Sequence, residues 1–322
     1  MKAIAQDKYG GAEVLELRDI DQPTPTETQV LLRVHAAGVD AGVLHLMTGQ
    51  PYLMRVVGFG FRVPKGKVRG RDVAGTVVTV GGKVTRFKPG DEVFGTCEGS
   101  FAEFVCARED RLATKPPSLT FEQAAAVPIS AGTALHAVRD SARVQPGEKV
   151  LVIGAAGGVG TFALQLAKMY GAVVTGVCST TKVDLVRSLG ADDVIDYTSQ
   201  DFADGKQRYD VVIDTAGSRS LTQLRRALTP KGRLVIVGGE GDGRWTGIGR
   251  PLRAMLLNLF VGQKLSGLAP RESAEDFRIL GEFIAEGKIH PVLDKTFQLS
   301  EAPDAIRYLQ AGKSRGKVVV LI

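Results

Sequence analysis

The chain has 322 residues and a mass of 34.3 kDa, which predicts about two domains at roughly 150 residues per domain. It is 44% apolar and 24% charged, as in ordinary globular proteins, and its formal net charge is +6. That excess is mild for this length, so it favours a soluble protein with a small anionic ligand over a dedicated nucleic-acid binder. The three cysteines, Cys97, Cys106 and Cys178, exclude a disulfide scaffold and lack the paired spacing of a structural zinc site.

No apolar run approaches the roughly 20 residues that cross a bilayer. The longest candidate, residues 254–261, is interrupted by Asn258. The N-terminal stretch is charged early and lacks the apolar core of a signal peptide. We therefore expect a cytoplasmic protein with no membrane partner.

The first third of the sequence predicts short strands. Residues 30–36 and 72–80 alternate in polarity and are rich in β-branched side chains, and residues 91–94 and 101–106 are short apolar runs. Glycine and proline separate these runs, as they do in residues 88–91. Many short strands with turn signals indicate an all-β, barrel-like unit.

After residues 115–117 the pattern changes. Two helices are predicted first, and strands and helices then alternate, which indicates a parallel sheet built from right-handed βαβ units. The tail, from about residue 267, predicts two more helices and two more strands, which could close that sheet or return to the first domain. The predicted helices are 121–127, 131–138, 160–170, 182–189, 221–228, 274–286 and 302–311, and the later strands are 149–153, 173–178, 194–196, 210–214, 233–237, 296–299 and 317–322.

A glycine-rich segment follows the strand at 149–153 and opens the helix at 160–170. Its pattern is A-x-G-x-x-G, with Ala155, Gly157 and Gly160 at the marked positions and Gly158 and Val159 between them. The second position lets the backbone approach a pyrophosphate, and the third lets the helix pack tightly on the strand. The pyrophosphate would lie at the positive helix N-terminus. The alternative is a glycine-rich turn without a ligand.

The end of the next strand predicts which dinucleotide binds. A free 2′-hydroxyl is usually held by an acidic residue about 20 residues after the loop. Here Ser179, Thr180 and Lys182 stand in that stretch, and the first carboxylate is Asp184. Hydroxyls and a cation suit a 2′-phosphate, so we expect NADPH. The alternatives are helix capping by Ser179 and Thr180 and a solvated charge at Lys182.

Several segments, in this order and spacing, carry a family resemblance across essentially the whole chain. They are residues 34–39, 70–75, 90–95, 99–104, 155–160, 189–192 and 315–319. The sequence resembles the zinc-independent branch of the medium-chain dehydrogenase/reductases, which includes NADPH quinone oxidoreductases and alkenal-reducing relatives.

The resemblance implies an α/β fold in two domains. A β-rich, GroES-like barrel domain would comprise residues 1–124, with residues 266–322 returning to it, and a Rossmann domain with a doubly wound parallel sheet would comprise residues 125–265. The active site is expected in the cleft where the nicotinamide meets the first domain. Asp40 and the Gly70-Arg71-Asp72 triplet replace the cysteine and the Gly-His-Glu triplet of the zinc-dependent relatives. We therefore expect no metal.

The resemblance also carries over cofactor contacts. Ser179, Lys182 and Tyr197 match the phosphate end, although Tyr197 could equally be an ordinary strand-end aromatic. Thr133 matches a threonine near the nicotinamide, with helix packing or capping as its alternative. The segment at Phe260 and Gly262 matches one that flanks the nicotinamide, and a buried apolar helix is its alternative. The remaining expected contacts are Thr215, Val237 and Gly238 at strand ends and Lys317, which could instead merely start the last strand.

On the acceptor side the sequence departs from the family pattern. Many relatives have an asparagine at the position of Asp40 and an aspartate at that of Val43. A carboxylate at position 40 accepts a hydrogen bond from a ribose hydroxyl but donates none. His45 and Tyr52 are candidates to donate a proton to a developing enolate or quinol oxygen. The alternatives are packing of His45 on the barrel, shaping of the cleft by Tyr52, and protonation by solvent.

The expected activity is hydride transfer from NADPH to a quinone or an α,β-unsaturated carbonyl, without a metal. One alternative is an NADPH-binding protein that binds nucleic acid or has a structural role, because Arg62, Lys65, Lys67, Arg69 and Arg71 form a basic run. A less favoured alternative is an alcohol dehydrogenase. The family resemblance implies a homodimer or homotetramer. Acceptor selectivity is expected in loops near residues 50–62 and 239–249, the second of which contains Arg244 and Trp245.

Overall fold

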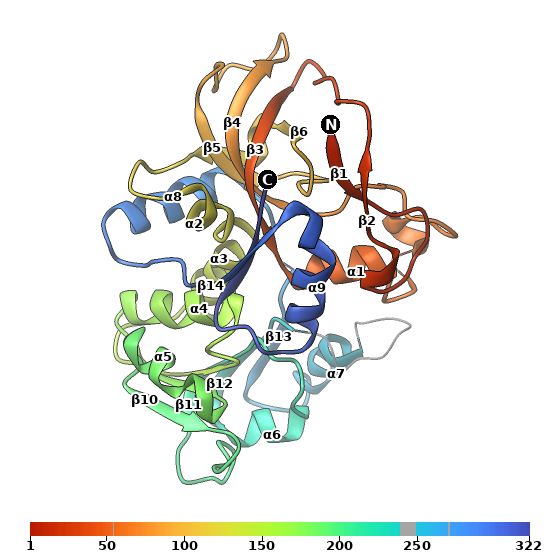
Figure 1. Ribbon diagram of the computed structural model, residues 1–322. Coiled ribbons are helices and arrows are strands. Elements are labelled where there is room, and N and C mark those ends of the chain that lie inside the picture. The colour runs from red at the N-terminus through yellow and green to blue at the C-terminus, as the bar shows by residue number, and fades with distance from the viewer. Residues whose placement is uncertain (54, 239–248, 270) are drawn as a thin grey trace. The chain divides into compact units, whose positions relative to one another are not determined.

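The computed structural model describes residues 1–53, 55–238, 249–269 and 271–322 (Figure 1). The chain forms two compact units, a first unit of residues 1–132 and 272–322 and a second unit of residues 133–271. The boundaries expected from the sequence fall inside α2 (Phe121–Ala125) and β13 (Lys264–Gly267). The units divide elsewhere because α2 packs on strands of the first unit and β13 pairs with a strand of the second.

The second unit contains the predicted doubly wound parallel sheet. Among the described residues its strands run in the order β10-β9-β8-β11-β12-β13, and each neighbouring pair is parallel. The order reverses between β8 and β11, and the crevice that takes a ligand in such folds lies at the carboxyl ends of these strands. The strands are β8 (Lys149–Ile153), β9 (Val173–Cys178), β10 (Asp193–Asp196), β11 (Tyr209–Asp214), β12 (Leu228–Ile236) and β13.

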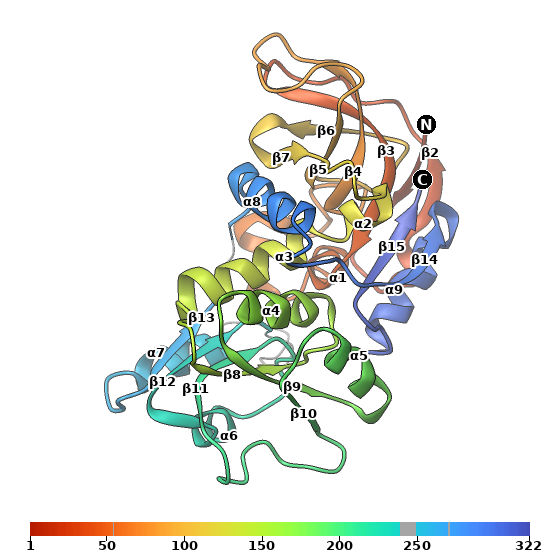
Figure 2. The ribbon, with the colours of Figure 1, turned by 90° about the vertical axis from the view of Figure 1, so that its left-hand side faces the viewer.

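Helices surround this sheet (Figure 2). Parallel strands covered on both faces need continuous apolar runs, and residues 150–152 and 211–213 are fully buried. The first crossover helix, α4, buries Phe162, Leu164 and Leu166. The helices are α3 (Pro128–Leu135), which crosses the unit boundary, followed by a helical turn over His136–Ala142, α4 (Gly158–Met169), α5 (Val183–Ser188), α6 (Leu221–Arg226) and α7 (Gly249–Leu257).

The first unit is the predicted β-rich unit, and both ends of the chain build it. In its described residues the main sheet has the order β14-β15-β3-β4-β5-β7, with β6 also paired to β3, while β1 and β2 form a separate hairpin. Of the two courses that the sequence left open, the tail takes the return to the first unit, through β14 and β15. The parallel sheet is extended instead by β13, which precedes the tail and was not predicted. The strands are β1 (Lys2–Ala5), β2 (Glu16–Asp19), β3 (Gln29–Val39), β4 (Asp72–Val80), β5 (Glu92–Thr96), β6 (Phe104–Arg108), β7 (Leu112–Thr114), β14 (Leu293–Gln298) and β15 (Lys317–Leu321).

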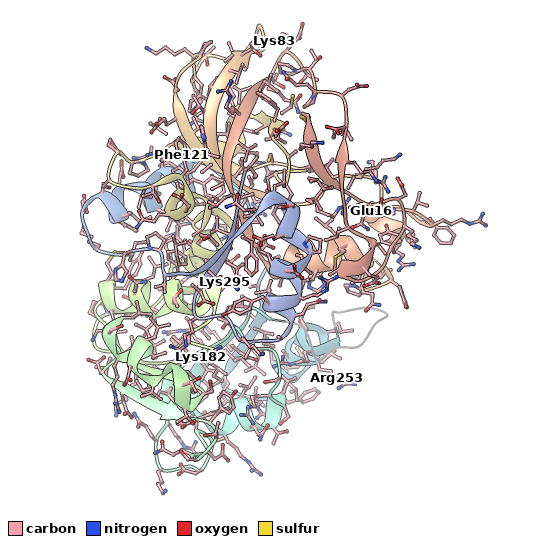
Figure 3. The ribbon with its side chains drawn as sticks, in the orientation of Figure 1. Glu16, Lys83, Phe121, Lys182, Arg253 and Lys295 are labelled. Carbon is pink, nitrogen blue, oxygen red and sulfur yellow. The ribbon has the colours of Figure 1, made fainter. Side chains whose placement is uncertain are left out.

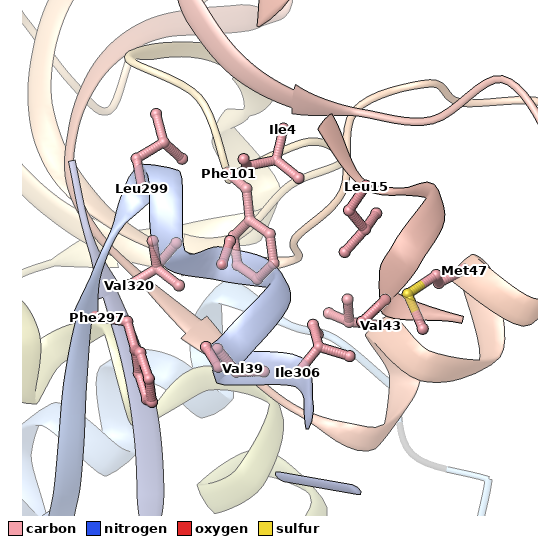
Figure 4. Packing of buried hydrophobic residues seen from close by; sticks show 14 of the residues in the cluster. Ile4, Leu15, Val39, Val43, Met47, Phe101, Phe297, Leu299, Ile306 and Val320 are labelled. Carbon is pink, nitrogen blue, oxygen red and sulfur yellow. The ribbon is translucent and has the colours of Figure 1, made fainter. Parts of the chain in front are cut away.

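Apolar side chains from both ends of the chain share one core (Figure 4). Ile4 and Phe101 pack with Val43 and Met47 of α1 (Ala41–Thr48), and Ile306 of α9 (Ala302–Gln310) reaches the same cluster. A further helix, α8 (Ala274–Ala285), also belongs to this unit. The first unit therefore depends on segments separated by nearly the whole sequence.

A buried ion pair joins the last strand to the middle of this sheet. Lys317 Nζ lies 3.0 Å from Asp72 Oδ2, and the two side chains are 1% and 0% exposed. The Ile129 N–H donates to Asp72 Oδ1 at 2.8 Å. A Cβ on Gly38 would lie 2.6 Å from Asp72 Oδ2, so position 38 must lack a side chain. Burial raises the pKa of the Asp72 carboxyl, and the Lys317 ammonium opposes that shift.

We expect Lys317→Met to lower the free energy of unfolding by about 3–5 kcal/mol, because it leaves a buried carboxylate without its cation. The loss should shrink as the pH falls, since the buried carboxyl then binds a proton more readily than it does in the unfolded chain. Urea unfolding measures both effects. Lys313→Met, at an exposed lysine, should change stability by no more than about 0.5 kcal/mol. Equal losses in the two variants would contradict the assigned role of the pair.

Candidate functional site

The glycine-rich segment lies at the carboxyl end of β8, next to the switch in strand order. Gly154 has φ +79°, and the N–H groups of Gly154 and Ala155 both donate to the Val177 carbonyl, at 3.1 and 3.0 Å. The Thr215 hydroxyl donates to the Ile153 carbonyl at 2.8 Å. The segment is therefore tied to β9 on one side and to the end of β11 on the other.

Helix α4 begins without a side-chain cap. Its N-cap residue is Gly157, and no side chain in the described residues accepts a hydrogen bond from the first turn. The first-turn N–H groups of a helix have no intrahelical partner, and they carry the positive end of the helix dipole. The start of α4, at Gly158, Val159 and Gly160, is therefore suited to hold an anion such as a pyrophosphate.

The glycines of this loop have different reasons to lack a side chain. A Cβ on Gly160 would overlap the Gly154 carbonyl oxygen, so close packing of α4 on β8 requires glycine there. A Cβ on Gly157 would lie 3.3 Å from the same oxygen, which only a small adjustment would relieve. Packing therefore fixes Gly160, whereas Gly157 keeps the space above the helix start open.

The end of β9 brings together the residues predicted for the 2′-phosphate. Ser179 precedes a short turn at Thr180–Lys182, and its hydroxyl caps neither that turn nor α5. Helix capping by Ser179, the alternative reading, is therefore absent. Lys182 is half-buried at the start of α5 (Figure 3). The Thr180 hydroxyl lies 3.0 Å from that of Thr198, so it is already engaged inside the protein.

A carboxylate that was not predicted also lies at this position. Asp196 ends β10 directly beside Cys178, and it accepts hydrogen bonds from the N–H and hydroxyl of Thr198 at 2.9 and 2.7 Å. The hydroxyl of Thr180, with the two Thr198 donors, lowers the pKa of Asp196. The parallel pairing of β10 with β9 could have revealed Asp196, because neighbouring parallel strands end at the same edge of a sheet.

A second cation approaches the same edge from the loop after β11. The Arg219 guanidinium lies 5.6 Å from the ring centroid of Tyr197 and 5.8 Å from that of Phe202. The Tyr197 N–H donates to the Cys178 carbonyl at 3.1 Å, which places this half-exposed ring at the end of β9. Arg219 was not predicted, since nothing in the local sequence relates it to Tyr197.

The ends of β11 and β12 meet as predicted. The N–H groups of Val237 and Gly238 donate to the Asp214 carbonyl at 2.9 and 3.2 Å, and a Cβ on Gly238 would lie 2.7 Å from the Thr215 carbonyl oxygen. Behind this corner Arg250 Nη2 lies 2.6 Å from Asp214 Oδ2, and both side chains are buried. This ion pair was missed, although an aspartate closing an apolar strand indicates a buried partner.

Of two expected nicotinamide contacts, Gly262 lies at the wrong end of the sheet, whereas the contact of Phe260 stays a prediction. Gly262 precedes β13, and a Cβ on it would lie 3.0 Å from the Pro230 carbonyl oxygen, near the start of β12. That edge of a parallel sheet is opposite the ligand crevice. Phe260 is 82% exposed, so it is not part of a buried helix, and it borders a hollow of about 730 Å³ between residues 217–222 and α7. Leu268, whose N–H donates to the Ile236 carbonyl, stands at the correct end of β13.

The two remaining cofactor candidates, Thr133 and Lys317, have buried side chains. Thr133 is buried in α3, and Lys317 is held by Asp72 away from solvent. Their contacts with a cofactor stay predictions. The expected loop at residues 239–249, with Arg244 and Trp245, falls almost wholly on residues 239–248, which lie outside the described residues.

The acceptor-side candidates all belong to the first unit. Asp40 caps α1 through a 2.6 Å hydrogen bond from the Gly42 N–H to Oδ1. Its Oδ2 is buried and has no hydrogen-bond partner in the described part of the chain. His45 is exposed, with Nδ1 2.9 Å from the Gln50 carbonyl oxygen, so Nδ1 carries hydrogen. Nε2 then accepts in the neutral ring and donates only when the ring is protonated.

Tyr52 is held by a stacked cation. The Arg55 guanidinium lies 4.7 Å from the Tyr52 ring centroid and 4.2 Å from that of Tyr9. Arg55 also donates to the carbonyls of Gly49 and Thr48, at 2.8 and 2.9 Å. The segment after α1 is therefore fixed to the rest of its unit at Tyr52.

The basic run does not form a continuous stripe of solvated cations. Arg69 is buried and donates to the Gly66 carbonyl, and Arg71 pairs with Glu272. Lys67 lies 3.5 Å from Asp7. Only part of the run is thus presented to solvent, which reduces the support for a nucleic-acid interface.

Metal-ligating side chains do not cluster in the described residues, where no group of three or more His, Cys, Asp or Glu side chains could hold an ion. Arg71 stands between Gly70 and Asp72, where zinc-dependent relatives have histidine, and its guanidinium cannot serve as a ligand. None of the described helices has the length and apolar character that crossing a membrane requires.

The two loop glycines give a test with separate readouts. We expect Gly157→Ala to remain folded but to lose dinucleotide affinity by roughly tenfold or more, because its methyl group occupies the approach to the helix start. We expect Gly160→Ala to lower thermal stability as well, because its Cβ overlaps the Gly154 carbonyl. Fluorescence titration and thermal unfolding measure the two effects. Unchanged dinucleotide affinity in Gly157→Ala would contradict the proposal that the pyrophosphate approaches the start of α4 over Gly157.

Known proteins resemble the whole chain. Residues 26–117 match the alcohol dehydrogenase GroES-like domain, and residues 189–320 match the zinc-binding dehydrogenase family. The chloroplastic NADPH-dependent alkenal/one oxidoreductase of Arabidopsis thaliana is 35% identical over 99% of this chain and 79% of that protein. The quinone oxidoreductase of Mus musculus is 32% identical over 100% and 98%.

A solved structure of a quinone oxidoreductase is also similar to the whole chain. The quinone oxidoreductase from Coxiella burnetii has a TM-score of 0.89 and 31% identity, covering 100% of this chain and 99% of that one. The chain therefore belongs to the zinc-independent, quinone oxidoreductase-like branch of the medium-chain dehydrogenase/reductases.

Proposed function

We propose that this protein is an NADPH-dependent oxidoreductase that reduces a quinone or an α,β-unsaturated carbonyl. The observation that carries the proposal is the uncapped start of α4 over Gly157 and Gly160, in a chain related throughout to quinone and alkenal reductases. The bound cofactor supplies the hydride, and the chemistry left to the protein is binding, orientation and management of one proton.

The second unit fits NADPH. The first-turn N–H groups of α4 would hold the pyrophosphate, and the Ser179 hydroxyl with the Lys182 ammonium would hold the 2′-phosphate. Arg219 adds a cation beside Tyr197. Asp196 opposes this attraction, but Thr198 and Thr180 already supply its hydrogen bonds. The balance of charge at this edge supports a phosphate.

The first unit supplies the groups proposed to act on the acceptor side. Asp40 Oδ2, a buried acceptor without an internal partner, is suited to receive a hydrogen bond from the nicotinamide ribose. With Nδ1 on the Gln50 carbonyl, the neutral His45 ring has no hydrogen on Nε2 to give, whereas the Tyr52 hydroxyl is itself a donor. A quinone can also take its proton from water. Of the two side chains, Tyr52 is the better supported donor to an enolate.

We infer a homodimer, with a homotetramer as the alternative. The outer edge of β13 is unpaired in the described chain, and α7 beside it exposes Leu252, Met255 and Leu256 at 51%, 67% and 55%. An edge strand next to exposed apolar side chains is a typical subunit contact. Sedimentation equilibrium measures the assembly. The three free cysteines support a reducing compartment, which includes the proposed cytoplasm.

Turnover tests the proposed activity directly. Metal-stripped protein should oxidise NADPH in the presence of a simple quinone or a conjugated enal, and NADH should support a much lower rate. The preferred acceptor would identify the subclass. Tight NADPH binding with no turnover of either acceptor would contradict the reductase and favour the NADPH-binding protein.

Cofactor choice should depend on the end of β9. We expect Lys182→Ala to weaken NADPH binding by roughly tenfold or more and to leave NADH binding nearly unchanged, because a charge-assisted contact to the 2′-phosphate is lost. Lys231→Ala, at an exposed lysine near the start of β12, is the matched control and should change neither affinity. A parallel loss for both cofactors would show that Lys182 acts on the fold.

A further inference from the structure

The segment after α1 combines positive charge with exposed apolar side chains. From residue 41 to residue 71 the sequence contains no Asp or Glu, and it contains six Lys and Arg residues. Three of these, Arg55, Arg69 and Arg71, are engaged inside the first unit. The others are exposed, and Arg62 and Lys65 have no acidic neighbour on their own segment.

The same segment also carries large exposed apolar side chains. Val56 and Phe61 are each 71% exposed, and Val63 is 57% exposed. Single exposed apolar residues are ordinary, but several together beside free cations indicate an interaction surface. We call Val56, Phe61, Arg62, Val63 and Lys65 the basic apolar face. In Figure 1 the segment that carries it follows α1 and projects at the right-hand side.

The backbone beneath this face is held in place. The Tyr9 hydroxyl donates to the Gly60 carbonyl at 2.7 Å, and Arg55 binds two carbonyls at the end of α1. Gly60 has φ +104°, and a Cβ there would overlap the Val63 carbonyl, so residues 60–63 form a tight turn. Phe61, Arg62 and Val63 are therefore presented by a fixed turn, which limits the ordering entropy lost on binding.

We propose that the basic apolar face binds the surface of an anionic lipid bilayer. Phe61, Val63 and Val56 would enter the boundary between headgroups and acyl chains, while Arg62 and Lys65 contact anionic headgroups. The expectation of no membrane partner rested on the lack of a spanning segment. Binding at the bilayer surface needs no such segment, so that expectation does not bear on this proposal. A symmetric contact between two copies of this face would oppose like charges, which disfavours a second copy as the occupant.

Vesicle binding by the full-length protein tests the proposal. We expect sedimentation with phosphatidylcholine vesicles containing about one third phosphatidylserine, weaker sedimentation with pure phosphatidylcholine, and loss of binding as salt is raised. Phe61→Ser/Val63→Ser and Arg62→Glu/Lys65→Glu should each reduce the partition coefficient roughly tenfold or more. The control variant Lys88→Glu/Lys313→Glu also replaces two exposed cations of the same unit by carboxylates. Its partition coefficient should stay within about twofold of the parent's.

Thermal unfolding and NADPH titration of every variant separate loss of binding from loss of fold, and neither depends on turnover. Binding to the mixed vesicles that is lost only in the variants of the face supports the proposal, whether or not the protein reduces a quinone. Lack of binding to these vesicles would overturn it, as would equal binding by all variants. A change of oligomeric state in Phe61→Ser/Val63→Ser, without vesicle binding in the parent, would assign the face to a protein contact and also overturn the proposal.

Discussion

A lysine and an aspartate with almost no access to water fix the centre of the first unit. The Lys317–Asp72 pair links β15 to β4, and the strand between them, β3, must carry glycine at position 38 to make room. The same carboxylate receives the Ile129 N–H, which sets the start of α3. Asp40 acts on Asp72 as a like charge and adds to the burial that raises the pKa of the Asp72 carboxyl, so Lys317 must offset both. Such an arrangement tolerates little change, because removing either partner leaves a charge that water cannot reach.

The ligand crevice of the second unit depends on backbone groups and not on a buried ion pair. The N–H groups at the start of α4 are accessible because glycine stands at positions 157 and 160. Gly160 brings α4 against β8, and Gly157 leaves the helix start without a cap. The buried Asp214–Arg250 pair stabilises the neighbouring corner, where Asp214 Oδ1 accepts the Gly217 N–H at 3.1 Å. Cofactor approach and helix packing therefore depend on two different glycines of one loop.

The sequence predicted the parallel sheet because its strands are buried on both faces and so appear as continuous apolar runs, as at residues 150–152 and 211–213. It also predicted the glycine loop, since spacing within one βαβ unit is a local property. What it missed depends on pairing between distant segments: Asp196 reaches the end of β9 only because β10 lies beside it, and Arg219 reaches Tyr197 from another loop. Gly262 was misplaced because its position relative to β13 decides which edge of the sheet it occupies. Burial of Arg69 within a basic run is likewise invisible in composition.

The interrupted construction of the first unit has a consequence for biosynthesis. β15 (Lys317–Leu321) is made long after β3, yet it lies between β14 and β3 in the sheet order. While residues 317–321 are still inside the ribosome, β3 lacks this neighbour and Asp72 lacks its cation. The second unit is continuous in sequence and can fold as soon as residue 271 has emerged. The N-terminal strands, although made first, must wait until β15 has emerged, and their apolar core is exposed to chaperones and to aggregation throughout that interval.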